Sequence, residues 1–299
     1  MLFALLAAFL FACSGVCAQR TSSMIGPVKA NALRLAFATL VLGIWVLLTG
    51  GVDIHTTAAR RLFVSGLVGF GLGDMALFFA LPRLGARLTL LINLCTAPVF
   101  GLVGDRWLLG TRLEPFHALG CAVILVGVSQ ALLARKSRPA ASTSRTAGFV
   151  AALIAGFGQG TGATLSRWSH QVQSSVGEML PSNHETFLRV LAGTLAVLPF
   201  WLVVRGRRQT YTWAVERPLS PRAWLWIIAN ATVGAILGVT CFQHALLDAS
   251  SGVVLSITAT TPILVMPMTA YSERDVPSAG SIAGALVAVA GMVMLKLGA

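Results

Sequence analysis

Residues 66–98 read GLVGFGLGDMALFFALPRLGARLTLLINLCTAP, and this stretch decides the fold. It is apolar and long enough to cross a bilayer, yet it contains one carboxylate, Asp74. A charged side chain in the hydrocarbon is costly unless it faces a partner or a water-filled cavity, so Asp74 is a candidate functional residue. Just before it, Gly66, Gly69 and Gly73 share one helix face, on which a neighbouring helix can pack closely.

A similar pattern returns in the second half of the chain, where residues 231–264 read ATVGAILGVTCFQHALLDASSGVVLSITATTPIL. Aligning the two stretches, with a one-residue shift near the end, pairs Gly69 with Gly234, Gly73 with Gly238, Ala80 with Ala245 and Pro98 with Pro262. Other segments pair in the same order: Ala8, Gly15 and Arg20 with Ala155, Gly162 and Arg167; Leu33-Arg34 with Leu188-Arg189; and Gly120 and Gly127 with Gly284 and Gly291. These pairs indicate an internal repeat.

The composition is that of a multi-pass membrane protein. Of the 299 residues, 56% are hydrophobic and 11% are charged, and the mean hydropathy is +0.80, which is too apolar for a soluble globular protein. Apolar runs close to the length of a membrane span lie at residues 2–17, 31–49, 60–81, 86–103, 115–134, 147–166, 185–204, 222–243, 252–270 and 278–297. The formal net charge of +12 comes from basic residues in short loops, which favours anionic lipid headgroups over nucleic acid as the partner.

The apolar runs fall into two sets of five, on either side of the polar stretch RKSRPAASTSR. We therefore predict a first five-helix repeat at residues 1–134, a linker at 135–146 and a second five-helix repeat at 147–299. Because five is odd, homologous repeats joined in series must lie in opposite orientations. The predicted fold is an all-α integral membrane protein of about ten transmembrane helices, arranged as two inverted five-helix repeats. Residues 2–17 resemble a secretory signal, but their internal counterpart favours a structural helix.

Motifs of enzymes and cofactor sites are missing from the sequence. It has no Walker A loop, no GxSxG elbow and no GxGxxG after a strand, and the HExxH-like start at His184 continues to Leu188 instead of a second histidine. The five cysteines include no CxxC pair and are interpreted as small apolar side chains. We predict that the protein is not an enzyme and has no catalytic residues, no cofactor and no metal site.

These features resemble the drug/metabolite transporter (DMT) superfamily, specifically transporters with tandem EamA-like domains. The resemblance rests on the glycine-rich first and sixth helices, the Leu-Arg pairs of the second and seventh, the GxxxG of the third and eighth, and Thr96 to Pro98 and Thr261-Pro262 in the fourth and ninth. The loop before each repeat's last helix commonly reads Gly-Glu-Arg in the family. Glu273-Arg274 keep that acid and base, whereas the first repeat has Thr111-Arg112. The resemblance implies a carrier with both termini in the cytoplasm.

The candidate substrate- or proton-binding residues are polar side chains within apolar helices, and each has a structural alternative. Asp74 binds a proton or a substrate cation, or else it partners a helix end or a basic side chain. Arg34 and Arg189 lie a few residues inside a helix, which favours snorkelling to the interface over anchoring an anionic substrate. Three more candidates either line a cavity or hydrogen-bond a neighbouring helix, and both interpretations stay open: Asn93, Gln243 and His244.

One helix face connects the two repeats. The offset that carries Gly73 onto Gly238 also carries Asp74 onto Val239 and Phe78 onto Gln243. Each repeat thus keeps one polar and one apolar residue on this face, in exchanged places. We predict that Asp74 and Gln243 face one another across a central cavity, with Phe78 in its wall.

The predicted function is secondary active transport, with export of small organic metabolites or drugs in a bacterial inner (plasma) membrane. The expected partners are a small-molecule substrate and membrane lipid, with protons as a candidate coupling ion and no nucleic acid. The alternative is a non-transporting polytopic membrane protein, either an assembly or interaction subunit or an intramembrane enzyme with unrecognised residues. The sequence leaves open the substrate, the coupling ion, the direction of transport and the oligomeric state.

Two arguments disagree on the orientation of the chain in the membrane. The loops away from the termini contain fourteen Lys and Arg residues, against six on the side of the termini. The positive-inside rule therefore places both termini outside, whereas the family resemblance places them in the cytoplasm. The sequence leaves the orientation open.

Overall fold

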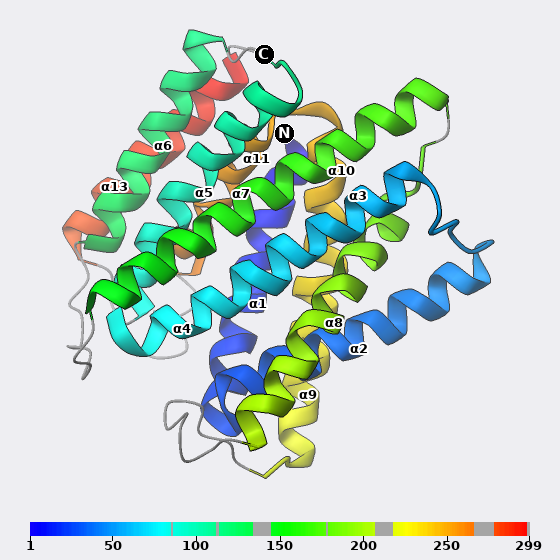
Figure 1. Cartoon of the computed structure of the whole chain (residues 1–299). Coiled ribbons are helices and arrows are strands. Elements are labelled where there is room, and N and C mark those ends of the chain that lie inside the picture. The colour runs from blue at the N-terminus through cyan, green and yellow to red at the C-terminus, as the bar shows by residue number, and fades with distance from the viewer. Residues whose placement is uncertain are drawn as a thin grey trace.

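The structure, a computed structural model of the chain, describes residues 1–84, 86–111, 114–133, 145–177, 179–206, 218–265 and 278–297. In these ranges it is a bundle of helices without strands (Figure 1). The helices in chain order are α1 (Leu2–Ile25), α2 (Pro27–Leu48), α3 (Thr57–Gly66), η1 (Leu67–Gly73), α4 (Asp74–Leu84), α5 (Ala86–Leu108), α6 (Pro115–Leu133), α7 (Arg145–Val176), α8 (Ser182–Gly206), α9 (Pro221–Asn230), η2 (Ala231–Gly238), α10 (Val239–Asp248), α11 (Ser251–Thr258) and α13 (Ala279–Leu297). The segments η1 and η2 are π-helical.

Ten helical segments have the composition of membrane spans. Eight spans in the described ranges are long and apolar enough to cross a membrane, and two shorter apolar helices lie at Ser251–Val265 and Ala279–Leu295. Two of the eight are composite: α3, η1 and most of α4 form the span Thr57–Leu81, and α9, η2 and α10 form Pro221–Asp248. The predicted number of about ten helices is confirmed.

The last helices of the two repeats, α6 and α13, meet through glycines in a reciprocal way. A Cβ added to Gly127 would lie 2.6 Å from the carbonyl oxygen of Gly284, and a Cβ added to Gly284 would lie 2.6 Å from the carbonyl oxygen of Gly127. Gly120 and Gly291 approach each other's carbonyl oxygens in the same manner. Because Gly120 and Gly127 are the sequence equivalents of Gly284 and Gly291, this contact is the one expected at a two-fold axis between the repeats.

The repeats are interleaved as well as inverted. α1 packs against α9, η2 and α10, the third span of the second repeat, and α7 packs likewise against α3, η1 and α4 of the first. In Figure 1, α1 begins at the N label and runs toward the opposite end of the bundle, whereas α7 begins at that opposite end and runs back. The first helices of the repeats therefore point in opposite directions, and the predicted inverted arrangement is confirmed.

Buried polar side chains reinforce these exchanged contacts at equivalent positions. Ser65 at the end of α3 donates its hydroxyl to the carbonyl oxygen of Gly162 on α7 at 2.6 Å. Asn230, the equivalent residue at the end of α9, accepts from the Ser14 hydroxyl of α1, also at 2.6 Å. Such hydrogen bonds between helices stabilise membrane bundles, in which no hydrophobic effect drives helix association.

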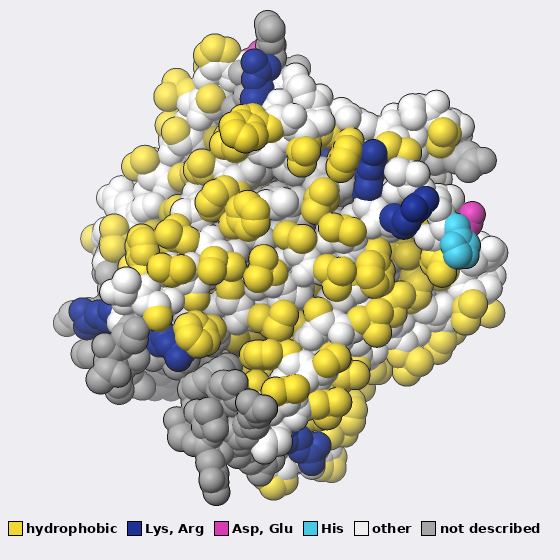
Figure 2. All heavy atoms as spheres, viewed as in Figure 1, with side chains coloured by type: hydrophobic (Ala, Val, Ile, Leu, Met, Phe, Trp, Pro, Cys, Tyr) yellow, Lys and Arg dark blue, Asp and Glu magenta, His cyan; other side chains and the backbone are white. Residues whose placement is uncertain are grey.

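The outer surface is apolar over the middle of the visible face, and the Lys and Arg side chains lie toward its edges (Figure 2). Large hydrophobic residues are strongly exposed, among them Leu47 on α2 (79%), Leu225 on α9 (69%) and Leu286 on α13 (67%). Exposed apolar area of this extent would be unfavourable in water but suits contact with lipid tails. The chain is therefore an integral multi-pass membrane protein, and its orientation in the membrane stays open.

Candidate functional site

Both third spans contain a π-helical segment on the N-terminal side of their candidate polar residues. η1 ends at Gly73, directly before Asp74, and η2 ends at Gly238, directly before α10. Such segments are rare and are frequent at functional sites, because they interrupt the regular hydrogen-bond ladder. Close packing accompanies them: a Cβ on Gly66 would lie 2.7 Å from the Cα atom of Arg189 on α8. The predicted glycine face therefore brings the first repeat against a candidate residue of the second.

Asp74 belongs to a polar cluster with two side chains of α2. Arg34 Nη2 and Asn31 Nδ2 each donate to Asp74 Oδ2 at 3.4 Å. Arg34 Nη2 also donates to Asn31 Oδ1 at the shorter distance of 2.7 Å. The guanidinium is thus held by the amide more closely than by the carboxylate. Because the side chains of Arg34 and Asp74 are 18% and 14% exposed, the cluster is not sealed in a helix contact.

Arg189 forms the second polar contact, deep between the repeats. It is 5% exposed and donates through Nη1 to Gln243 Oε1 at 2.5 Å. Its guanidinium carbon lies 5.5 Å from the ring centroid of Phe70 on η1 and 5.7 Å from that of Phe242 on α10. Snorkelling to the interface is therefore the wrong interpretation for Arg189, because α8 is enclosed here by α2, α3, η1 and α10.

Two donor groups in this contact lack a partner. Arg189 Nε and Gln243 Nε2 are buried and have no hydrogen-bond partner among the described residues. In the cluster around Asp74, Arg34 Nε is likewise buried and without a partner among these residues. A buried donor without an acceptor costs free energy, so such groups call for an explanation. An acceptor supplied by a bound solute would satisfy them.

The two arginines are equivalent in the repeats but lie at opposite depths. Arg34 is seven residues past the start of α2 at Pro27, and Arg189 is seven past the start of α8 at Ser182, which is about 10 Å along each axis. Since α2 and α8 start from opposite ends of the bundle, the two clusters lie toward opposite ends of it (Figure 1). In each repeat the arginine of the second span reaches a polar residue of the third span of its own repeat.

The other predicted site residues have varied surroundings. Asn93 on α5 is 2% exposed, and its Oδ1 has no partner among the described residues. The His244 ring lies 4.0 Å from that of Phe3 on α1, and its Nδ1 lies 3.4 Å from the Ser182 hydroxyl. Phe78 is partly buried. Asp74 and Gln243 both bond within their own repeats, and the cavity predicted between them stays a prediction.

A buried network that the sequence analysis missed surrounds Glu185. This carboxylate is fully buried; its Oε2 lies 2.9 Å from His170 Nε2, and its Oε1 accepts from Gln173 Nε2 at 2.8 Å. Gln173 Oε1 accepts in turn from the backbone amide of Leu180 at 2.6 Å. The network fastens the end of α7 to the start of α8. The signal was available, because Glu185 opens an apolar run and its two partners precede it by only 15 and 12 residues.

A second missed carboxylate joins three helices. Asp105 on α5 is 2% exposed and accepts from Arg167 Nη1 of α7 at 2.7 Å. It also accepts from the backbone amide of Ser251 at 2.7 Å and from its hydroxyl at 2.8 Å. Its negative charge thus sits at the N-terminus of α11, where the helix dipole favours an anion. The family motif in the loop before the last helix of each repeat cannot be compared with this junction, because Arg112 in the first repeat and Glu273 and Arg274 in the second lie outside the described ranges.

In the described ranges, eight spans and two shorter apolar helices form two inverted, interleaved repeats with polar side chains between them, an arrangement found in many secondary transporters. The EamA-like transporter family matches residues 1–133 and 146–297. This chain therefore belongs to the EamA-like transporter family, as the sequence resemblance predicted. The exact bounds of the repeats stay a prediction.

Solved structures agree with this fold. One of them, described as "Crystal structure of protein", aligns over 99% of this chain and 96% of its own with a TM-score of 0.77 and 19% sequence identity. At that identity the likeness shows the fold alone. No curated protein matches the chain.

Proposed function

We propose that this protein is a secondary active transporter that exports small organic solutes in exchange for protons across a bacterial inner membrane. The observation that carries the proposal is the cluster of Asp74, Arg34 and Asn31, a titratable group with a loosely held cation inside a membrane span. Charged residues at membrane depth are costly to keep, and they mark ion or substrate pathways. We propose no catalytic activity for this protein.

Asp74 is the proton-binding residue of this proposal. Protonation would remove its charge and release Arg34, but Arg34 would keep its 2.7 Å hydrogen bond to Asn31. The cluster can therefore change charge without leaving the guanidinium unpartnered, which is the costly outcome for a buried cation. The partial exposure of both side chains gives a proton or a solute access to the carboxylate.

Arg189 and Gln243 form the solute-binding contact. Both present buried donors without partners in the part of the chain that the structure describes, and the rings of Phe70 and Phe242 flank the guanidinium. This combination of donors and aromatic faces fits a small organic molecule with an apolar body and a carboxylate or carbonyl group. The proposed cargo class is therefore amphiphilic solutes with an acceptor group.

The opposite depths of the two clusters fit an alternating-access cycle. In inverted-repeat transporters, rocking of one bundle against the other exposes a shared site to each side in turn. The exchanged contacts of α1 and α7 would be the surfaces on which the repeats move. Proton release at Asp74 and solute release at Arg189 would then be coupled through one rearrangement.

The test is solute flux in vesicles reconstituted with the purified chain, with and without an imposed pH gradient, over a panel of labelled organic anions and neutral solutes. Asp74→Asn should reduce pH-driven flux at least about tenfold, because the amide has nearly the size of the acid but cannot titrate. Solute exchange at equal pH should persist in this variant. Asp53→Asn, in the exposed loop between α2 and α3, is the matched control and should leave both rates unchanged.

Two outcomes would refute parts of the proposal. Unchanged pH-driven flux in Asp74→Asn would remove the coupling role of this carboxylate. Absence of flux for the whole panel in correctly folded protein would instead favour the alternative of a non-transporting membrane protein.

A further inference from the structure

An apolar groove opens on the outside of the bundle, and no residue of the polar clusters lines it. Its volume is about 690 Å³, and its walls are formed by the third, sixth and seventh spans. Leu72, Met75 and Phe79 line it from η1 and α4, Val150 and Ile154 from α7, and Phe200 from α8. Volumes of this size hold drug-sized ligands, but the lining is almost entirely apolar and offers hardly any hydrogen bonds. The groove is therefore suited to a hydrocarbon chain.

Two arginines lie at one end of this groove. Arg145 is the exposed first residue of α7 and directly precedes Thr146 and Ala147 in the groove wall. Arg83, in the last turn of α4, places its guanidinium carbon 3.4 Å from the ring centroid of the groove residue Phe79.

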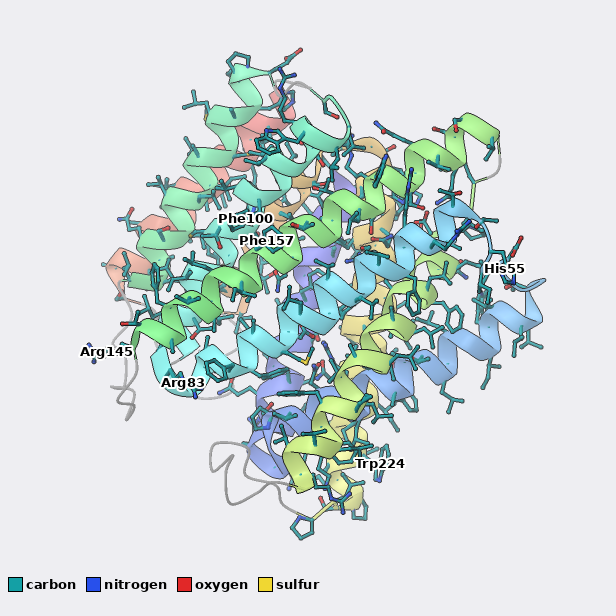
Figure 3. All side chains as sticks on the ribbon, viewed as in Figure 1. His55, Arg83, Phe100, Arg145, Phe157 and Trp224 are labelled. Atoms are coloured by element: carbon teal, nitrogen blue, oxygen red, sulfur yellow. The ribbon has the colours of Figure 1, made fainter. Side chains whose placement is uncertain are left out.

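Packing brings the two arginines to the same rim. A Cβ added to Gly148, one turn into α7, would lie 2.8 Å from the Cβ of Arg83, so the ends of α4 and α7 are in contact. Figure 3 shows Arg83 and Arg145 near each other at that end of the two helices. Both belong to the face opposite the chain termini, where α4 ends and α7 begins (Figure 1).

We propose that this groove is a binding site for an anionic phospholipid, with an acyl chain between α4, α7 and α8 and the phosphate group against Arg83 and Arg145. The charge complementarity at the rim selects this occupant. A basic pocket at the membrane surface attracts acidic headgroups, and each arginine adds to the affinity. An uncharged apolar ligand could bind in the groove, but the two arginines would not increase its affinity.

The depth of the groove agrees with the same occupant. Phe79 lies one helical turn before Arg83, and Val150 and Ile154 follow Arg145 by about one to two and a half turns. A lipid with its phosphate at the arginines would direct its chain toward these residues, from the membrane surface to the interior. The site is distinct from the solute contact at Arg189, and it does not depend on the proposed transport activity.

The experiment is native mass spectrometry of the delipidated full chain in neutral detergent, titrated with phosphatidylglycerol or phosphatidylcholine of identical acyl chains. The wild type should bind phosphatidylglycerol more tightly. Arg83→Gln and Arg145→Gln should each weaken phosphatidylglycerol binding about fivefold and leave phosphatidylcholine binding unchanged. Ala76→Trp, which fills the groove, should weaken binding of both lipids.

Matched controls separate the site from general effects. Arg222→Gln removes an exposed charge from the same face, at the start of α9, which packs on α1, α2 and η2 rather than on the groove. Ala283→Trp adds the same bulk on the exposed side of α13. Both should bind like the wild type. Equal affinity for the two lipids would overturn the proposal, as would an Arg222→Gln loss as large as that of Arg83→Gln or Arg145→Gln.

Discussion

Asp74 and Gln243 accept hydrogen bonds from the equivalent arginines of the two repeats, but the two acceptors are one helical turn apart when the repeats are aligned. Superposing the third spans places Asp74 on Val239, four residues before Gln243. Arg34 reaches the carboxylate at 3.4 Å and Arg189 reaches the amide at 2.5 Å. Both repeats have an arginine at this position, but its acceptor is a carboxylate in one repeat and an amide in the other. The Asp74 carboxylate can titrate, whereas the Gln243 amide cannot, so the two repeats differ in their chemistry.

The first prediction separates stability from function at Arg189. Gln243→Leu leaves the buried guanidinium without its acceptor and should lower the free energy of unfolding by about 2–3 kcal/mol. The double variant Arg189→Met with Gln243→Leu should recover most of this loss, because a buried polar pair can be replaced by apolar side chains of similar size. Both Gln243→Leu and the double variant should be unable to transport the solute, because the proposed solute-binding contact is lost.

The measurements are thermal unfolding in detergent and solute flux in vesicles. If the double variant were as unstable as Gln243→Leu, the loss would come from packing rather than from the uncompensated cation. If it transported normally, Arg189 would have no part in solute binding.

The second prediction concerns the glycine contact of α6 and α13. Gly127→Ala would place its Cβ 2.4 Å from the backbone nitrogen of Ala288, and Gly284→Ala would place its Cβ 2.5 Å from that of Ala131. Neither backbone can move cheaply, so each variant should lose about 1–3 kcal/mol of stability. Because the two clashes occur at one interface, the double variant should lose less than the sum.

Gly15→Ala is the matched control for this prediction. Gly15 lies within α1, and nothing lies within 4 Å of its added Cβ. Alanine is the better helix former, so this change should be neutral or stabilising by up to about 1 kcal/mol. Thermal unfolding of the four variants and the wild type checks the set, and a Gly127→Ala variant as stable as the wild type would contradict the two-fold contact.

The third prediction tests Asp105 as a junction of three helices. Asp105→Asn removes the charge that faces Arg167 and the N-terminus of α11, and it should cost about 3–5 kcal/mol. Adding Arg167→Gln should recover part of this cost, since it removes the partly buried cation left without its carboxylate. Glu114→Gln is the control: its side chain is 74% exposed and lies 3.9 Å from His117, and surface pairs contribute little. Equal stability of Asp105→Asn and Glu114→Gln would contradict the assignment.

Much of the fold could be predicted from the sequence because its repeat signals are packing signals. Except for Gly15, the glycines at constant offsets are places where helices of one repeat touch those of the other, so Gly120, Gly127, Gly284 and Gly291 identified a real interface. The odd number of spans per repeat then fixed the inversion. Neither step required knowing where any side chain points.

The candidate site was harder to predict because it depends on the rotation and depth of helices. Asp74 and Arg34 stood out as charges, but their distance could not be derived from spacing along separate helices. Asn31 carries no charge and was overlooked, although it lies on the same face of α2 as Arg34. Arg189 was assigned to the interface from its position near a helix start, whereas α8 packs against α2, α3, η1 and α10 and the residue is buried.

The fourth prediction uses the asymmetry between the two arginines. Arg34→Gln removes the cation that faces Asp74, and a carboxylate without a nearby positive charge holds its proton to higher pH. If transport requires release of that proton, the pH of half-maximal flux should rise in this variant, because Arg34 is the cation paired with Asp74 at 3.4 Å. Vesicle flux measured from acid to alkaline pH gives the profile.

Arg189→Gln is the control of identical chemistry in the other repeat. Its acceptor Gln243 does not titrate, and the nearest carboxylate on its helix, Glu185, keeps its bonds to His170 and Gln173. This variant should therefore lower solute affinity at every pH without moving the profile. If both variants shifted the pH profile of flux by the same amount, the shift would follow from the loss of any buried positive charge. Asp74 would then not be identified as the group that titrates. A shift confined to Arg34→Gln, absent from Arg34→Gln combined with Asp74→Asn, would assign the titration to that carboxylate.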